Sequence, residues 1–439
     1  MKGELGYLPF PAALHHVLAA RIDAPFGLQQ LLTIENSIFT EWRLRFYGRG
    51  VAVALVIAVL FSWVRRLGHW VVEPDGRLGN IDFCWMWVSG KFAAMQHPMQ
   101  IYDRIIYAAA QHIFYRPGEC QFMHQYVYPP TYLFFTYPLG LMPYLTAYAA
   151  WLGMTFVVYA AAIYAVVPRS AALIAALASA PMLKNIELGH NGFLFAGLIG
   201  LSLFGLRRRP WLSGILLGFL TCKPQLGVLF PLVLLISHNW RALASAAAMS
   251  GVLATAAALA FGDGTWPAFF ASLVNRTSDL SPQAGVELVL ESFYGLAHWV
   301  GAAAWLAWSI HLAVALSVWV IVTVVWGNRI AYPLKAATLC LGSLLTSPYL
   351  LPYDLCILPI AVAFLVQDGL SRGFLAGERV ILMVCFATLY CPLAPVGPII
   401  CLVLLLLVLR RIWKIREDAA IATPEPAREG PLIASHAYE

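Results

Sequence analysis

The chain has 439 residues, of which 61% are hydrophobic and only 11% are charged, and its mean hydropathy is +0.74. A soluble core cannot bury so much apolar surface, so the composition excludes a soluble domain and predicts a polytopic membrane protein. The net charge of +6 does not indicate nucleic-acid binding, because the basic residues lie in short loops where they orient helices.

Residues 1–46 are predicted to form a cytoplasmic or interfacial segment. His15, His16, Arg21 and Asp23 interrupt its short apolar runs, and no small-residue cleavage site follows a continuous core. The segment is therefore not expected to be a cleavable signal peptide.

Residues 47–412 are predicted to form an all-α transmembrane domain with about 12 spans. Several runs are shorter than a bilayer requires, so flanking residues must complete their ends. The predicted spans are 47–65, 144–167, 170–184, 191–206, 211–222, 225–239, 242–261, 298–326, 331–346, 355–368, 378–391 and 395–412.

Residues 66–143 are predicted to form a large first extracytoplasmic loop. Stretches 82–97 and 103–115 have the pattern of short amphipathic helices on the membrane surface. Stretch 128–143 is apolar but has four prolines and too few residues to cross, so it is predicted to be re-entrant or surface-lying. Cys84 and Cys120 share this loop, and an oxidising compartment could join them.

The distribution of basic residues fixes the expected orientation. With 128–143 not spanning the membrane and the N-terminus inside, 19 of the 28 lysines and arginines fall on the inner side, as the positive-inside rule requires. A second outer loop is predicted at 262–297, where most charges should be solvated and 291–299 could fold back over the first loop. Residues 413–439, rich in Pro, Ala and Glu, are predicted to be a disordered cytoplasmic tail.

Polar residues suited to chemistry fall on the outer face in this arrangement. Asp82 is the only carboxylate between Asp75 and Asp103, and a carboxylate near the interface suits the base of a group-transfer reaction. Trp85 and Trp87 could stack on a sugar ring. The alternative role for Asp82 is a helix N-cap on 83–95.

Lys223 lies between two apolar stretches, and Pro224 forces a break there. A cation at such a position needs an anionic partner, which a phosphate headgroup would supply, or a route to the interface by snorkelling. Arg104 and Lys184 are weaker candidates for the same donor-phosphate role.

The remaining candidates are polar residues at predicted helix ends. His190 and Asn191 could bond hydroxyl groups, although a helix cap by Asn191 is the simpler role, and capping by Asp354 is favoured over catalysis. Tyr128, Gln225 and Tyr349 complete the predicted substrate-binding set. No carboxylate pair suited to a metal and no nucleotide-binding motif is present, so a metal-independent reaction with a lipid-borne donor is expected.

Several short motifs resemble a known family by their order and spacing. They are D-F-x-x-x-W-x-x-G at 82–90, I-Y-D at 101–103, Y-x-Y-P-P at 126–130, G-H-N at 189–191, K-P-Q at 223–225 and S-P-Y…Y-D at 347–354. The resemblance, over about 60–412, is to the bacterial GT-C membrane glycosyltransferases of family 87, which include polyprenyl-phosphate-mannose-dependent mannosyltransferases.

The resemblance implies a GT-C fold, Asp82 as the base, Lys223 on the donor phosphate and no cofactor. The expected partners are a polyprenyl-phosphate sugar donor, a lipid or glycan acceptor and membrane lipids. The expected location is the bacterial plasma membrane, with the site facing the periplasm. His190 stands where family members commonly have Gln, so the sugar stays open. A lipid-linked glycan transporter or flippase and a glycan ligase are the alternatives.

Overall fold

The computed structural model describes residues 82–114, 126–278, 290–390 and 394–422, together with four single helical positions, Gln30, Ser37, Val53 and Ile57. All regular structure in these residues is helical. The predicted segment 1–46, most of the first span 47–65, Cys120 and the end of the tail lie outside them.

The helices of the first outer segment are short. They are α4 (Phe83–Ala94), η1 (Pro98–Tyr102), α5 (Arg104–Phe114), η2 (Pro130–Tyr132) and α6 (Leu133–Gly140). The helices that follow are α7 (Tyr144–Val166), α8 (Ser170–Leu177), α9 (Ala180–Leu188), α10 (Gly192–Gly205), α11 (Pro210–Gly218), η3 (Phe219–Cys222), α12 (Pro224–Gly227), α13 (Leu229–Ile236), α14 (Trp240–Phe261), α15 (Thr265–Ser278), α16 (Phe293–Trp299), α17 (Ala304–Gly327), α18 (Tyr332–Thr346), η5 (Pro352–Cys356), α19 (Ile357–Arg372), α20 (Glu378–Thr388) and α21 (Gly397–Ala422).

Among the described residues, four helices are long and apolar enough to cross a bilayer: α7, α14, α17 and the continuous η5–α19 unit. Helices α8 and α9, bent by 59° at their junction, would make a fifth span if they act as one. Every predicted span from 144 to 412 falls on helical structure, but most of these helices are shorter. The all-helical membrane architecture is confirmed, and the count of twelve spans stays a prediction.

Helix α4 differs from the predicted surface helix because it is buried on nearly every side. It packs against α6. Gly90 and Gly140 make the close approach possible, because a Cβ at Gly90 would lie 2.0 Å from the Thr136 carbonyl oxygen. Helix α6 has only eight residues, with Pro138 inside it, which fits a segment that does not cross the membrane.

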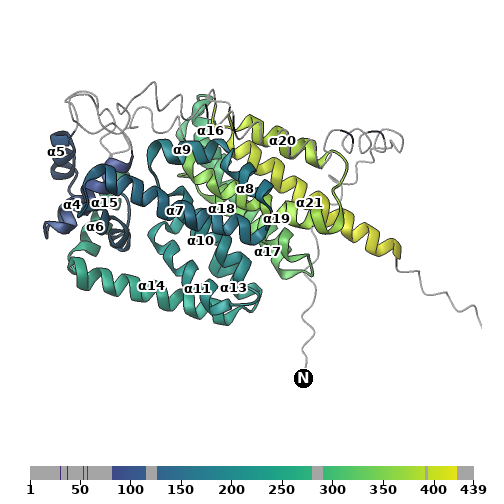
Figure 1. Ribbon diagram of the computed structural model, residues 1–439, viewed down its shortest axis with the longest axis horizontal. Coiled ribbons are helices and arrows are strands. Elements are labelled where there is room, and N and C mark those ends of the chain that lie inside the picture. Colours follow the sequence, from purple (N-terminus) through teal and green to yellow (C-terminus); the bar gives the residue numbers. More distant parts are fainter. Residues whose placement is uncertain are drawn as a thin grey trace, which may run out of the picture.

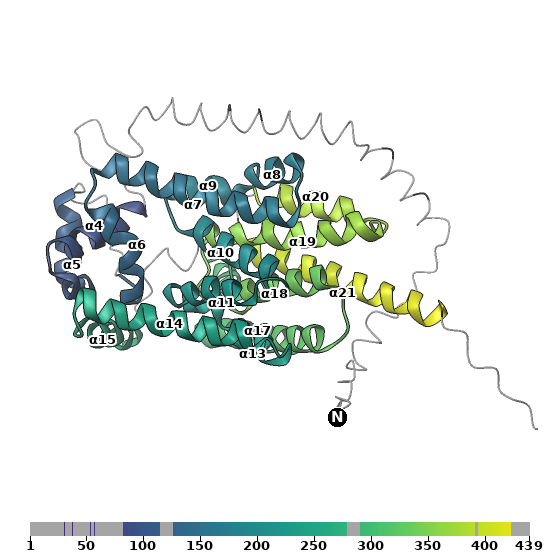
Figure 2. The same cartoon turned by 60° about the horizontal axis from the view of Figure 1, so that its bottom comes forward.

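The outer elements α4, α5, α6 and α15 gather at one end of the molecule, and the last turns of α21 project from the opposite end (Figures 1 and 2). The second outer segment contributes α15, whose Phe269 ring lies 5.8 Å from Tyr102 of η1. In the described residues α16 packs on α17 and α15 contacts η1, and the predicted fold-back of 291–299 over the first loop stays a prediction.

Helix α21 continues to Ala422, so 413–422 are helical and not disordered as predicted. Near this end of the molecule, Arg411 is buried between two carboxylates, Asp368 at 3.0 Å and Glu378 at 2.6 Å. The guanidinium therefore joins the end of α19, the start of α20 and α21 through charge-assisted hydrogen bonds.

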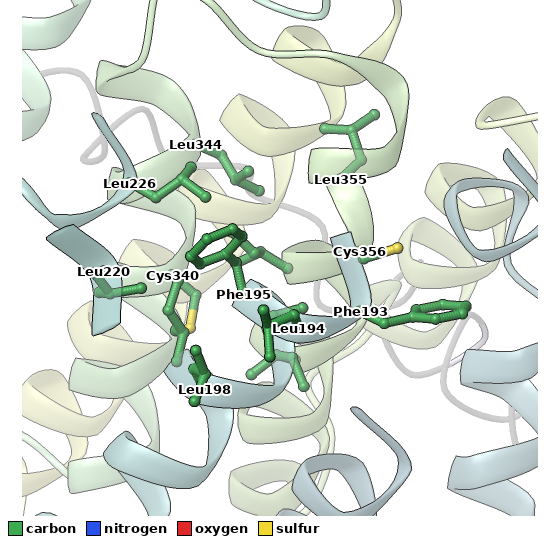
Figure 3. Close-up of a cluster of buried hydrophobic side chains, with 14 of the residues drawn as sticks. Phe193, Leu194, Phe195, Leu198, Leu220, Leu226, Cys340, Leu344, Leu355 and Cys356 are labelled. Atoms are coloured by element: carbon green, nitrogen blue, oxygen red, sulfur yellow. The ribbon is translucent and has the colours of Figure 1, made fainter. Parts of the chain in front are cut away.

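A tightly packed apolar layer lies where α10, η3, α12, α18 and η5 meet (Figure 3). Phe195 and Leu198 come from α10, Leu220 from η3, Leu344 from α18 and Leu355 from η5, and all are buried. This layer holds the ends of five elements together and so fixes the polar residues at those ends.

Candidate functional site

The centre of the candidate site is a buried ion pair between Lys223 and Asp354. Lys223 lies in the break between η3 and α12, where Pro224 begins the new helix. Its Nζ contacts Asp354 Oδ1, and the two side chains are only 3% and 2% exposed. The second oxygen, Oδ2, accepts a hydrogen bond from the Leu351 amide at 3.1 Å. Asp354 therefore caps η5, as predicted, and also neutralises Lys223.

Asn191 connects this ion pair to the aromatic residues of the outer segment. Its Oδ1 accepts a hydrogen bond from Lys223 Nζ at 3.3 Å, and its Nδ2 donates to the hydroxyl oxygens of Tyr128 at 2.9 Å and Tyr132 at 3.0 Å. Asn191 occupies the N-cap position of α10, but its side chain makes no capping hydrogen bond. The predicted capping role of Asn191 is therefore wrong, because residues from other helices use both ends of its amide.

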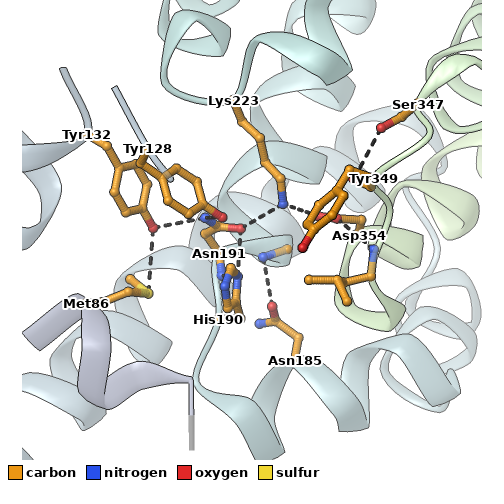
Figure 4. Close-up of polar contacts among 12 residues, drawn as sticks. Met86, Tyr128, Tyr132, Asn185, His190, Asn191, Lys223, Ser347, Tyr349 and Asp354 are labelled. Atoms are coloured by element: carbon orange, nitrogen blue, oxygen red, sulfur yellow. Dashed lines mark hydrogen bonds and ion pairs between the residues drawn. The ribbon is translucent and has the colours of Figure 1, made fainter. Parts of the chain in front are cut away.

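The junction that presents Asn191 is built locally. Gly189 ends α9 in the left-handed conformation, with φ of 66°, which a residue with a Cβ rarely adopts. Asn185 Oδ1 then accepts the Gly192 amide hydrogen at 2.8 Å, which satisfies the first turn of α10. The turn therefore directs Asn191 toward Lys223, with His190 beside Asn191, as Figure 4 shows.

His190 lies in a stack of aromatic rings. Its ring is 3.6 Å from that of Tyr353, nearly parallel at 13°, and 5.4 Å from Trp85. The Nδ1 atom is 2.9 Å from Asn191 Oδ1 and 2.8 Å from the Asn191 amide nitrogen. Only one of these contacts is a hydrogen bond in a given tautomer, since the first needs a proton on Nδ1 and the second a lone pair.

Trp85 and Trp87 do not offer the open faces expected of sugar platforms. Trp85 is 7% exposed and stacks on Tyr128 at 5.2 Å. Trp87 is equally buried and donates its Nε1 hydrogen to the Met142 carbonyl at 3.0 Å. In this conformation both rings pack the outer segment against the transmembrane helices.

Asp82 lies at the start of α4, beside this group. Its side chain is half-buried and makes no capping hydrogen bond to α4, so the alternative role as an N-cap is not what the structure contains. Burial raises the pKa of the Tyr128 phenol well above its ordinary value, and the nearby charges of Asp354 and Asp82 raise it further, while the Asn191 hydrogen bond opposes them. Asp82 also interacts with the charge of Lys223. The charges of Asp82 and Asp354 therefore both act on Tyr128 and Lys223.

We call Tyr128, His190, Asn191, Lys223 and Asp354 the polar cluster. Tyr349, 37% exposed, lies beside it in Figure 4. Gln225 is half-buried in α12, two residues after Lys223. Arg104 is exposed at the start of α5. Lys184 is 53% exposed and pairs at 2.8 Å with Glu187 of its own helix, which is not part of the polar cluster.

Sequence reasoning missed two features. The Tyr132 hydroxyl accepts a hydrogen bond from Asn191. Tyr132 comes about one helical turn after Tyr128, and that spacing was its only signal in the sequence. Glu291 was expected to be solvated, but it is partly buried and its Oε2 accepts the Gly397 amide hydrogen at 2.8 Å. Burial raises the pKa of Glu291 to about 7, which the Gly397 hydrogen bond opposes.

In the part of the chain that the structure describes, no group of three or more His, Cys, Asp or Glu side chains could hold a metal ion. The charged groups of the site are the carboxylates of Asp82 and Asp354 and the ammonium of Lys223. Such a set can accept a proton and can hold an anion.

A model of glycosyltransferase family 87 matches residues 126–348, just over half of the chain, and the chain therefore belongs to that family. The protein is a membrane glycosyltransferase, which implies a sugar donor and an acceptor. The matched residues include Tyr128, Asn191 and Lys223, whereas Asp82 and Asp354 lie outside them. Searches of curated proteins and of solved structures gave no match.

Proposed function

We propose that this glycosyltransferase moves a single sugar, mannose, from a polyprenyl-phosphate donor to a hydroxyl group of a lipid or glycan. The site faces the extracytoplasmic side of a bacterial plasma membrane, and the reaction inverts the anomeric carbon. The observation that carries the proposal is a buried lysine, paired with Asp354 at the ends of apolar helices, whose charge also interacts with that of the half-buried Asp82.

Asp82 and Lys223 act on different parts of the reaction. Asp82 takes the proton of the acceptor hydroxyl while its oxygen forms a bond to the anomeric carbon. The bond between that carbon and the phosphate oxygen breaks, and the electron pair leaves with polyprenyl phosphate. Lys223 stabilises the negative charge that develops on the departing oxygen. Phosphate is a good leaving group, so no general acid is required.

Asp82 suits the base better than Asp354 does. Asp354 is fully buried, and its two oxygens already accept hydrogen bonds from Lys223 and the Leu351 amide. With both oxygens occupied by these donors, Asp354 has no free position for an acceptor hydroxyl. Asp82 is half-buried and borders the same region, so an acceptor hydroxyl can reach it.

The donor is lipid-borne because the site lies among helices that span or enter the membrane. A polyprenyl chain can remain in the bilayer while its phosphate reaches Lys223 at the break before α12. We expect no metal requirement, since Lys223 meets the phosphate charge in this mechanism.

The test replaces Asp82 by Asn in the purified full-length protein and measures sugar transfer and donor binding separately. Loss of the base should reduce kcat by about 100-fold to 10,000-fold, while the donor binds nearly as in the wild type. Retained activity in Asp82→Asn would refute the role of Asp82.

The matched control is Asp103→Asn, another carboxylate of the first outer segment. Asp103 is exposed, and its Oδ1 accepts amide hydrogens from Ile105 at 2.9 Å and Ile106 at 3.0 Å. Asparagine can keep this cap, so transfer by Asp103→Asn should match the wild type.

A further inference from the structure

The orientation of the Asn191 amide follows from its neighbours. A lysine ammonium has only donors, so the atom of Asn191 that faces Lys223 must be the oxygen. The amide nitrogen then faces the other way, toward the two phenol oxygens of Tyr128 and Tyr132. Each of its two hydrogens is used by one phenol, which therefore acts as an acceptor.

The two tyrosines differ in where their own hydroxyl hydrogens go. They stack with ring centroids 4.3 Å apart, and both accept from the same amide. The Tyr132 hydroxyl points to Met86 Sδ at 3.7 Å, inside the core. Within the described residues, the Tyr128 hydroxyl makes only the contact from Asn191, so its hydrogen has no protein acceptor there.

The Tyr128 hydrogen is also close to the anion-binding lysine. Tyr128 and Lys223 approach the Asn191 side chain from opposite ends, so one amide group separates the phenol from the ammonium (Figure 4). A phosphate group carries several acceptor oxygens and can accept hydrogen bonds from both donors. Asp354 does not serve as the acceptor, because both of its oxygens already have donors.

We propose that Tyr128 donates its hydroxyl hydrogen to a phosphate oxygen of the donor, next to Lys223, and that Asn191 is the positioning residue that orients it. This inference rests on the proposed function for the identity of the donor. The raised pKa of Tyr128 keeps the phenol protonated, as a donor must be. The charge on the phosphate oxygen grows as the sugar leaves, so the hydrogen bond strengthens during the reaction.

The chain supplies a matched pair of variants. Tyr128→Phe removes the proposed donor, whereas Tyr132→Phe removes a hydroxyl that bonds the same amide but serves the core. A hydrogen bond to a charged group is worth about 1.5–3 kcal/mol, so Tyr128→Phe should lower kcat by about tenfold to a hundredfold, with a smaller change in KM. Tyr132→Phe should lower kcat clearly less than Tyr128→Phe does, because it loses two neutral hydrogen bonds, one from Asn191 and one to Met86, and none to the phosphate. Size-exclusion chromatography verifies that both variants fold.

A double-mutant cycle between Asn191 and Tyr128 tests the role of Asn191. Asn191→Ala should reduce kcat, but the further loss should be smaller when Tyr128 is already Phe, because the amide then has no hydroxyl to orient. If the two effects multiply independently, Asn191 does not act through Tyr128. Asn191→Gln, which keeps the amide, should recover part of the activity.

Binding of polyprenyl phosphate alone separates this inference from the proposed function. Tyr128→Phe should weaken that binding and Tyr132→Phe should not, whether or not mannose is transferred. If the wild type binds polyprenyl phosphate in this way but transfers no sugar from it, the phosphate site stands and the proposed reaction fails. Equal binding by both variants, or no binding by the wild type, would overturn the role of Tyr128.

Discussion

At the scale of single residues, the Lys223–Asp354 pair has two functions. A lone cation or carboxylate at this depth would be costly, and each group removes that cost for the other. The pair also holds the Lys223 ammonium beside Asn191. A ligand phosphate at this position would meet a group that the protein already orients.

This pairing predicts different outcomes for stability and for activity. Lys223→Met leaves Asp354 buried without a counter-ion and should lower the free energy of unfolding by about 3–5 kcal/mol. The double variant Lys223→Met with Asp354→Asn should recover most of that loss, because no unpaired charge remains. Thermal unfolding in detergent measures the recovery, and the sugar-transfer assay should show no recovery of activity. Strictly additive destabilisation would argue against the pair.

The sequence identified the residues of the polar cluster but not their contacts. Alternation of the spans placed Tyr128, His190, Asn191, Lys223 and Asp354 on one face, and the structure brings them together there. The capping rule failed for Asn191, because a capping hydrogen bond joins residues that are close in sequence. Its partners are distant in sequence: Tyr128 and Tyr132 in the first outer segment, and Lys223 at the break before α12. Such long-range pairings have no signal in a single sequence.

At the scale of elements, α4 positions Asp82 by its contact with α6. The run Phe83–Val88 is apolar on every side, which indicates a buried helix, and the expectation of a surface helix was wrong for that reason. The backbones of α4 and α6 meet at Gly90 and Gly140, where neither helix has room for a side chain. The distance between these helices therefore sets where Asp82 lies.

A methyl group at this contact should move the proposed base. In Gly90→Ala the new Cβ would lie 2.0 Å from the Thr136 carbonyl oxygen, so α4 must shift. Sugar transfer should fall by more than about tenfold, since small displacements of a catalytic group are costly. The transfer assay measures this loss, and normal activity in Gly90→Ala would contradict the dependence on α4.

The control for that variant is Gly251→Ala in α14, where a Cβ meets nothing within 4 Å. Alanine favours a helix over glycine by about 0.5–1 kcal/mol, so this change should leave transfer unaltered and raise stability slightly.

At the scale of the whole molecule, the candidate site and the buried Arg411 cluster lie at opposite ends of α19. Helix α19 begins next to Lys223 and ends at Arg372, near the buried Arg411 cluster. Exposed tryptophans mark both ends, with Trp299 and Trp305 nearer the site and Trp211 and Trp240 at the starts of helices that run toward it. Aromatic residues of this kind favour membrane interfaces and support a site at one surface of the bilayer.

The sequence predicted this architecture well because apolar runs and loop charges act over whole helices. Every described run predicted to span is helical, and α6 is too short to cross. The lengths of the helices were less predictable from the sequence. Pro224 begins α12 directly after Lys223, so the apolar stretch there is divided into Pro210–Cys222 and Pro224–Ile236, each shorter than a full span.

The most direct test of the account incubates the purified wild-type protein with radiolabelled polyprenyl-phosphate mannose and a membrane-lipid acceptor extract. We predict transfer of one mannose per molecule of polyprenyl phosphate released, no transfer from a nucleotide-linked mannose, and no release by Asp82→Asn. Movement of the intact donor across the bilayer without release of polyprenyl phosphate, or transfer of a whole glycan, would contradict the proposed reaction.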